Sequence, residues 1–302
     1  MWFHASRVNP LRSSLLALSR NHWLGRRLPN SSAGRRAARR FMPGERLEDA
    51  VAASAGLGKR GIACVLTELG EDVTDAGAAD RAARSYEAAL DALAAARLSA
   101  QISVKPTHLG LLLDPGDAAE RASALAERAA TLEGVVWVDM EGSSHVDATL
   151  ELFESMARRH RNVGLCLQAY LRRTPADADR LLPLRPRIRL VKGAYAEASE
   201  IAFQAGGDVD AAYERVAGQL LEGGAEVAFA THDTALLARL DPRAEVQMLY
   251  GIRADQQRRL AAEGRRVRVL ISYGSEWFAW YMRRLAERPA NLLFAMRAMV
   301  GG

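Results

Sequence analysis

Charged side chains recur in this chain at the ends of short apolar runs, at the positions where β-strands would end. Lys105 and Asp139 each end one such run, Arg189 and Lys192 share another, and His232 follows a further one. Ammonium and guanidinium groups bind carboxylates and phosphates, and a carboxylate or an imidazole can move a proton. Because the carboxyl ends of barrel strands meet at one rim, we expect these groups to form a single polar site.

The complete ring of polar residues at these run ends is larger. It comprises Lys105, Asp139, Glu141, Gln168, Tyr170, Arg189, Lys192, Tyr195, Thr231, His232, Asp233, Tyr250 and Tyr273. Each member has a structural alternative: Lys105 and Asp139 on neighbouring strands also suit a purely structural ion pair, and a lone His at a strand end is usually a hydrogen-bonded structural group. No His or Cys spacing typical of a metal site occurs, so no metal is expected.

A basic pair follows the last apolar run, within a helical pattern over residues 275–294. Arg283 and Arg284 are adjacent, so they project about 100° apart and reach one target only if the helix end overhangs the site. Glu287, three residues after Arg284, can hold that guanidinium. Arginine matches a carboxylate bidentately, so the pair predicts a carboxylate clamp, with a solvated helix face as the alternative.

Eight short apolar or alternating runs predict eight strands, and helical patterns lie between them. The strand-like runs cover residues 61–70, 102–105, 135–141, 163–169, 188–194, 227–233, 245–251 and 267–272. Repeated strand and helix units favour an α/β protein with a (βα)8 TIM-like barrel, preceded by N-terminal helices and with a C-terminal helix over the barrel mouth. Catalytic groups then lie at the carboxyl ends of the strands.

An open doubly wound sheet is the competing fold, and it usually carries a glycine loop after its first strand. A G-x-G-x-x-G match occurs at Gly56, Gly58 and Gly61, but it precedes a strand instead of following one. Its amides are therefore in the wrong place to hold a phosphate, and we interpret it as a helix end followed by a turn.

Positive charge is concentrated at the start of the chain. The 302 residues carry a net charge of +5, yet residues 1–40 hold nine Arg and no Asp, Glu or Lys, so the remainder carries −4. We expect residues 1–40 to form a basic arm or helix that docks on the domain or contacts acidic lipid, with a cleaved targeting segment as the alternative, and residues 41–302 to form the barrel. The arm lacks interleaved aromatic residues, so no nucleic acid is expected.

Composition also bears on location. No apolar run approaches the roughly 18 residues of a membrane-spanning helix. Cys64 and Cys166 lie in separate apolar runs and are interpreted as buried reduced thiols. We therefore expect a cytoplasmic protein, with peripheral contact at the inner face of the membrane.

At these residues the chain resembles the proline dehydrogenase family. The matching segments, in the family's order, are 102–105, 138–141, 167–173, 189–195, 229–233, 247–253, 273–274 and 283–287, of which RLVKGAY at 189–195 and the later RRLAE are the most specific. The resemblance extends from about residue 41 to the end of the chain. It implies FAD as cofactor, L-proline as substrate, Δ1-pyrroline-5-carboxylate as product, a membrane quinone as electron acceptor and pyrroline-5-carboxylate dehydrogenase as a partner enzyme.

Residue by residue, the resemblance also implies roles. Lys105, Arg283 and Arg284 hold the substrate carboxylate, with Glu287 and Leu249 beside the substrate. Asp139, Arg189, Tyr195 and Tyr273 form the catalytic pocket. FAD is contacted by Met140, Gln168, Arg189, Lys192, Gly193, Ala194, Thr231 and His232.

One position departs from the family pattern. The family places Tyr three residues before the arginine pair, and Trp280 stands there in this chain. Preference among proline-like cyclic amino acids is therefore open. The alternative enzyme is a Schiff-base lyase or aldolase barrel in which Lys192 is the nucleophile.

Overall fold

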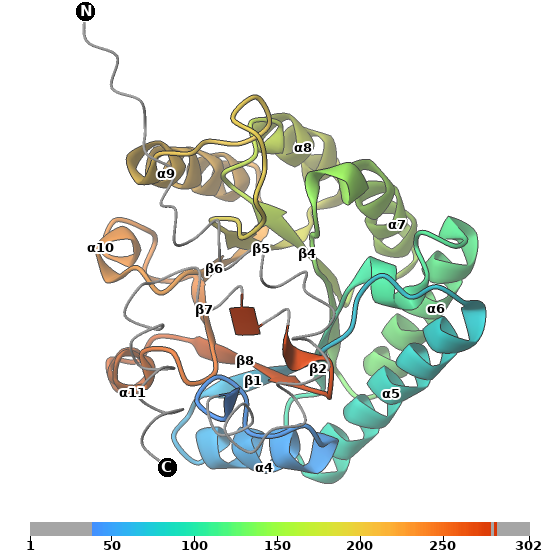
Figure 1. The fold of residues 1–302 in the computed structure, drawn as a ribbon. Coiled ribbons are helices and arrows are strands. Elements are labelled where there is room, and N and C mark those ends of the chain that lie inside the picture. Colours follow the sequence, from blue (N-terminus) through green and yellow to red (C-terminus); the bar gives the residue numbers. More distant parts are fainter. Residues whose placement is uncertain (1–37, 279–280, 283–302) are drawn as a thin grey trace, which may run out of the picture.

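Eight parallel strands form a closed barrel, which the computed structural model describes over residues 38–278 and 281–282 (Figure 1). The strands are β1 (Ala63–Glu68), β2 (Gln101–Val104), β3 (Val135–Val138), β4 (Val163–Gln168), β5 (Arg187–Val191), β6 (Glu226–Ala230), β7 (Glu245–Leu249) and β8 (Val267–Tyr273). They pair in chain order, and β8 closes on β1. The predicted (βα)8 barrel is confirmed, and each strand overlaps a run that the sequence singled out.

Helices surround the barrel on its outer side (Figure 1). They are α4 (Leu47–Gly58), α5 (Ala76–Ala95), α6 (Pro115–Ala130), α7 (Val146–Arg159), α8 (Thr174–Leu181), α9 (Gly206–Glu222), α10 (Thr234–Leu237) and α11 (Ala254–Ala262), with 3-10 turns η1 (Pro106–Leu109), η2 (Ser143–His145) and η3 (Leu182–Leu184). Helix α4 precedes β1 and packs against β1 and β8. Residues 1–37 of the predicted arm and most of the predicted C-terminal helix lie outside the described residues, so the boundary at residue 40 stays a prediction.

Local sequence signals explain where the helices begin. Asp75 caps α5 by accepting the Ala78 N–H at 2.8 Å, and Asp114 caps α6 by accepting the Asp117 N–H at 3.0 Å. Pro115 follows Asp114 at the first helical position, where its missing N–H costs no helical hydrogen bond. The G-x-G-x-x-G match lies at the end of α4 and in the turn before β1, where Gly61 has φ +70°. It is therefore the helix end and turn that the sequence predicted.

Two apolar regions hold the barrel together. The larger lies between the strands and the helices and includes Tyr86, Phe153 and Phe229, all fully buried. The smaller fills the barrel interior and is formed by Val65, Val135, Trp137 and Ala228 with Leu270. Strand residues alternate between these two regions, so every second side chain points into the barrel. This alternation selects which polar residues reach the interior.

None of the described helices is both long and apolar enough to cross a bilayer. Cys64 and Cys166 are buried free thiols, as predicted. Burial raises the pKa of Cys64 to about 11 and that of Cys166 to about 12. Both are therefore protonated and poorly nucleophilic near neutral pH.

Candidate active site

A cavity of about 470 Å³, here called the mouth cavity, opens at the carboxyl ends of the strands. All eight strands or the segments directly after them contribute to its wall. The predicted residues that line it are Lys105, Asp139, Met140, Glu141, Gln168, Arg189, Lys192, Gly193, Ala194, Tyr195, Thr231, His232, Asp233 and Leu249. Its volume falls within the roughly 300–1,000 Å³ typical of small-molecule sites.

Lys105 lies directly after β2, in the wall of the mouth cavity, and is 9% exposed. Its Nζ donates a hydrogen bond to the carbonyl oxygen of Gly70 at 3.2 Å. Among the described residues, no carboxylate forms an ion pair with it. Its charge acts to lower the pKa of Glu68 and of Glu141, but neither carboxyl group forms an ion pair with it. A buried ammonium group without an ion-pair partner is costly unless an anion joins it. The cavity therefore contains a position suited to an anion.

Arg189 on β5 lies at the base of the mouth cavity and is 3% exposed. Its Nε donates to Gln247 Oε1 at 2.6 Å, and its Nη1 donates to Ser103 Oγ at 2.8 Å and to Asp139 Oδ1 at 2.9 Å. Ser103 also donates to Asp139 at 2.7 Å. These bonds fix the guanidinium plane, while its Nη2 is buried without a hydrogen-bond partner among the described residues.

Gln168 at the end of β4 offers a second unsatisfied polar atom. Its Nε2 donates to the carbonyl oxygens of Met140 at 3.1 Å and Glu141 at 2.7 Å. Its Oε1 is buried and has no donor within the described part of the chain. Arg189 and Gln168 both line the mouth cavity, so its wall contains one buried donor and one buried acceptor without partners among the described residues, which suits a ligand whose edge carries both functions.

Glu141 lines the same cavity and is 4% exposed. It accepts hydrogen bonds from the Thr107 N–H at 3.0 Å and the Thr107 hydroxyl at 2.7 Å. Burial raises the pKa of Glu141 to about 7, and the two bonds from Thr107 only partly oppose this. Glu141 is therefore a carboxyl group that changes its charge near neutral pH.

Lys192 follows β5 and is held by two carboxylates. Its Nζ lies 2.5 Å from Asp210 Oδ1 and 2.9 Å from Asp233 Oδ2. Partial burial acts to lower the pKa of Lys192, but the hydrogen bonds to Asp210 and Asp233 outweigh it and the net shift is upward. Asp233 also caps α10 by accepting the N–H groups of Ala235 and Leu236, each at 3.1 Å. Lys192 therefore stays protonated.

A glycine brings the chain close to the cavity after Lys192. Gly193 has φ +124°, a conformation that side-chain-bearing residues rarely adopt, and a β-carbon there would collide with the Tyr170 ring. The Tyr170 hydroxyl donates to the carbonyl oxygen of Tyr195 at 3.3 Å. Gly193 and Tyr170 thereby fix the path of residues 192–195 along the rim. After the neighbouring strand β6, His232 Nε2 accepts the Leu249 N–H at 3.3 Å.

A family model described as proline dehydrogenase matches residues 50–297 of this sequence. The chain belongs to the proline dehydrogenase family. It is thus an oxidoreductase with the barrel and the mouth cavity just described.

Curated relatives in the proline dehydrogenase family match almost end to end. Proline dehydrogenase 1 of Bacillus subtilis is 34% identical over 300 residues, which cover 96% of this chain and 99% of the relative. Proline dehydrogenase of Deinococcus radiodurans is 36% identical over 280 residues, covering 88% and 90%. The crystal structure of proline utilization A from Bdellovibrio bacteriovorus has the same fold, with a TM-score of 0.77 and 23% identity over 86% of this chain. This chain spans only 33% of that protein.

Four residues that the family resemblance singles out are not placed in the cavity wall. Tyr273 pairs in register with Glu68, while its neighbour Ser272 pairs with Thr67, which lines the cavity. Because alternate strand residues face opposite sides, Tyr273 points toward the outer layer, and its hydroxyl is buried without a hydrogen bond from a described residue. Arg283, Arg284 and Glu287, like Trp280, lie outside the described residues.

Several residues of this proline dehydrogenase site were not predicted. Ser103 and Gln247 bind Arg189 and lie two positions before Lys105 and Leu249, so strand alternation was a usable signal. Asp210 lies in the first turns of α9, and no strand pattern connects it with Lys192. No group of three His, Cys, Asp or Glu able to hold a metal occurs among residues 38–278 and 281–282.

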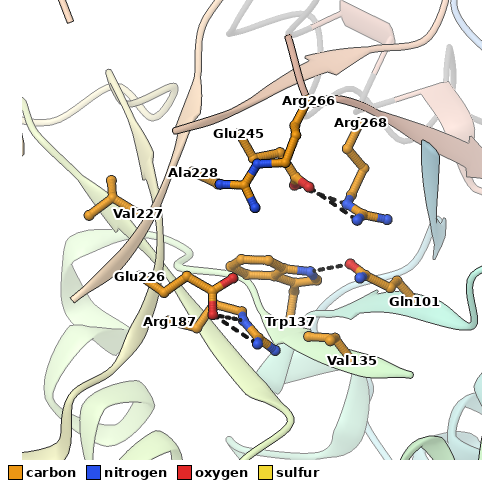
Figure 2. A pocket seen from close by; sticks show the side chains of 10 residues that line it. All are labelled: Gln101, Val135, Trp137, Arg187, Glu226, Val227, Ala228, Glu245, Arg266 and Arg268. Atoms are coloured by element: carbon orange, nitrogen blue, oxygen red, sulfur yellow. Dashed lines mark hydrogen bonds and ion pairs between the residues drawn. The ribbon is translucent and has the colours of Figure 1, made fainter. Parts of the chain in front are cut away.

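A second cavity, of about 140 Å³ and here called the lower cavity, lies at the amino ends of the strands (Figure 2). Two ion pairs border it: Arg268 with Glu245 at 2.9 Å, and Arg187 with Glu226 at 2.9 Å. Trp137 lies between them in Figure 2 and is part of the wall. Arg266 also lines it and donates to the carbonyl oxygen of Arg243 at 3.0 Å. Residues at this end of a barrel usually contribute stability.

Proposed function

We propose that this chain oxidises L-proline to Δ1-pyrroline-5-carboxylate with bound FAD and passes the electrons to a membrane quinone. The observation that carries the proposal is the buried ammonium group of Lys105, which lines the mouth cavity without a carboxylate partner from the described residues. An amino-acid substrate supplies that carboxylate. Membership of the proline dehydrogenase family then indicates which amino acid it is.

The cavity has polar atoms that suit the flavin ring system. Arg189 Nη2 is an unsatisfied donor and Gln168 Oε1 an unsatisfied acceptor, and the isoalloxazine edge carries both acceptors and a donor. When bound, FAD supplies the oxidant that accepts a hydride from the substrate carbon beside nitrogen. The remaining proposed contacts come from lining residues, namely Met140, Lys192, Gly193, Ala194, Thr231 and His232.

The protein's own groups have three proposed tasks. Lys105, joined by Arg283 and Arg284 with Glu287 behind them, binds the substrate carboxylate and so orients the ring. Asp139 balances Arg189 through their 2.9 Å ion pair and keeps its guanidinium in place. Tyr195 and Leu249, which line the mouth cavity, shape the pocket around the ring, and Tyr273 at the end of β8 supports it from outside the cavity wall.

A pH dependence follows from the chemistry of the substrate. Hydride departure from the carbon beside nitrogen requires a neutral amine, because a protonated amine has no lone pair to form the new C=N bond. We therefore propose that activity rises with pH through the pKa of the bound substrate's amine.

The lyase alternative conflicts with the surroundings of Lys192. A Schiff-base lysine must be neutral to attack a carbonyl, and the usual way to achieve this is desolvation without a counter-charge. Here Asp210 and Asp233 both contact the ammonium group and hold its pKa above the ordinary value. The second alternative, oxidation of another proline-like cyclic amino acid, uses the same site and is decided by substrate competition.

The proposed partners follow from the products. Pyrroline-5-carboxylate dehydrogenase is a proposed partner, because it would take the product of this reaction as its substrate. A membrane quinone as acceptor implies peripheral contact with the inner membrane face.

The test is the visible spectrum of the purified protein, recorded anaerobically before and after proline. We expect the bands of oxidised flavin, and we expect proline to bleach them. A protein that stays colourless after FAD is added contradicts the proposal. In that case, borohydride trapping of a carbonyl substrate on Lys192 distinguishes the lyase.

A further inference from the structure

Arg189 is supported from below as well as from the sides. Its guanidinium carbon lies 4.7 Å from the centroid of the Trp137 ring. Three hydrogen bonds hold Nε and Nη1 in the plane, but none of them fixes the height of that plane in the barrel. The guanidinium stacks on the face of the Trp137 indole ring. A cation that is buried over a Trp ring is attracted to it.

Trp137 is itself fixed by its neighbours. Its Nε1 donates to Gln101 Oε1 at 3.0 Å. On β4, Gly164 lies beside the ring, and a β-carbon at that position would collide with the indole. Trp137 lines the lower cavity (Figure 2), whereas Arg189, which lies over its ring, lines the mouth cavity. Gln101 and Gly164 thus shape a position that accepts an indole in one orientation.

We propose that Trp137 is a positioning residue, which stacks beneath Arg189 and holds its guanidinium, with the unpaired Nη2, in the wall of the mouth cavity. This inference rests on the proposed function for the identity of the ligand that Nη2 meets. A smaller side chain would join the two cavities and allow the guanidinium to sink toward the charges of the lower cavity. The guanidinium of Arg189, including Nη2, would then be displaced and partly hydrated.

The experiment compares Trp137→Leu and Trp137→Phe with Phe153→Leu. Phe153 is fully buried in the outer apolar layer on α7, so its substitution loses a core ring without touching either cavity. We expect the affinity for FAD, from titration of cofactor-free protein, to fall about tenfold in Trp137→Leu and about threefold in Trp137→Phe. We expect the flavin reduction potential to become more negative in the same order. Phe153→Leu should lower thermal stability but leave both quantities unchanged.

A milder variant keeps the indole itself. Gln101→Met removes the acceptor for Trp137 Nε1 without contacting Arg189, and we expect it to lower FAD affinity less than Trp137→Leu but more than Phe153→Leu. If Trp137→Leu and Gln101→Met both match Phe153→Leu in FAD affinity and potential, the positioning role is wrong.

A cofactor-free measurement separates this inference from the proposed function. A double-mutant cycle of Trp137→Leu with Arg189→Met, followed by denaturant unfolding without FAD, reports the stack alone. We expect the two substitutions to be coupled by about tenfold in the unfolding constant, equivalent to ~1.4 kcal/mol. Coupling in a protein that binds no FAD would uphold the stack and contradict the proposed function. Additive effects would contradict the stack whatever FAD does.

Discussion

Replacing Lys105 with Met is the sharpest test of the substrate site. The substitution keeps the length and apolar stem of the side chain but removes the ammonium group that lines the mouth cavity. In the folded protein this group makes one hydrogen bond, to Gly70 at 3.2 Å, and no ion pair with a described residue. Losing that bond costs about 1 kcal/mol, and removing an unpaired buried charge offsets it. The free energy of unfolding should therefore change little.

The effect on substrate binding should be much larger. A hydrogen bond between charged groups is worth about 1.5–3 kcal/mol, which corresponds to a KM for proline raised roughly 10- to 150-fold. The carboxylate is not attached to the carbon that loses hydride, so its binding is similar in the ground and transition states. We expect kcat to change far less than KM.

Steady-state kinetics with proline and titration of the protein with FAD measure the two halves of this prediction. Lys59→Met is the matched control, because Lys59 is exposed in the turn between α4 and β1. An unchanged KM in Lys105→Met would refute the assignment of Lys105 to the carboxylate. Loss of FAD with an unchanged KM in the fraction that retains it would place Lys105 at the cofactor instead.

Three further predictions concern other parts of the site. Burial raises the pKa of Glu141 from 4.5 to about 7, so between these pH values the folded protein binds one proton more than the unfolded chain does. The free energy of unfolding therefore falls as pH rises through this range. Glu141→Gln should remove this decrease, measured by denaturant titrations at pH 4.5 and 8. Gly193→Ala should weaken FAD binding, because backbone strain at such a φ is of order 1–3 kcal/mol and the Tyr170 ring blocks the added β-carbon. The control is Gly207→Ala, which has open space around its β-carbon and should leave the flavin fluorescence titration unchanged. Arg284→Met, outside the described residues, should raise KM for proline about 100-fold while FAD stays bound, and loss of FAD would show that the pair is misplaced.

The strands could be predicted from the sequence because their apolar runs are short and bounded by Gly, Pro or charged residues. The residues at the strand ends followed, since Lys105, Asp139 and Arg189 all occupy inward positions of their strands. Tyr273 was also assigned to the pocket; the register of β8 with β1 places it outside the cavity wall, so its role at the pocket stays a prediction. Register depends on pairing between strands distant in the chain, which a single run does not reveal.

Contacts between a strand and a distant helix were equally hidden. Asp210 on α9 lies next to Lys192 only because the barrel closes and brings the start of that helix to the rim. Trp137 looked like one more apolar strand residue, and its relation to Arg189 requires two strands to be placed in three dimensions. Sequence patterns identify which side chains reach a site but not which side chains hold them there.

Two lysines line the same cavity in opposite electrostatic settings, and this difference separates the competing functions. Lys192 contacts two aspartates, so it is already neutralised, offers little attraction to a further anion and is a poor nucleophile. Lys105 is buried, and a buried lysine usually forms an ion pair. No carboxylate of the described residues forms one with it. A lyase needs the reverse arrangement, with a neutral amine at Lys192. The arrangement in this chain favours binding of an anionic substrate at Lys105. In the wall of the same cavity, Arg189 Nη2 and Gln168 Oε1 each have no hydrogen-bond partner among the described residues.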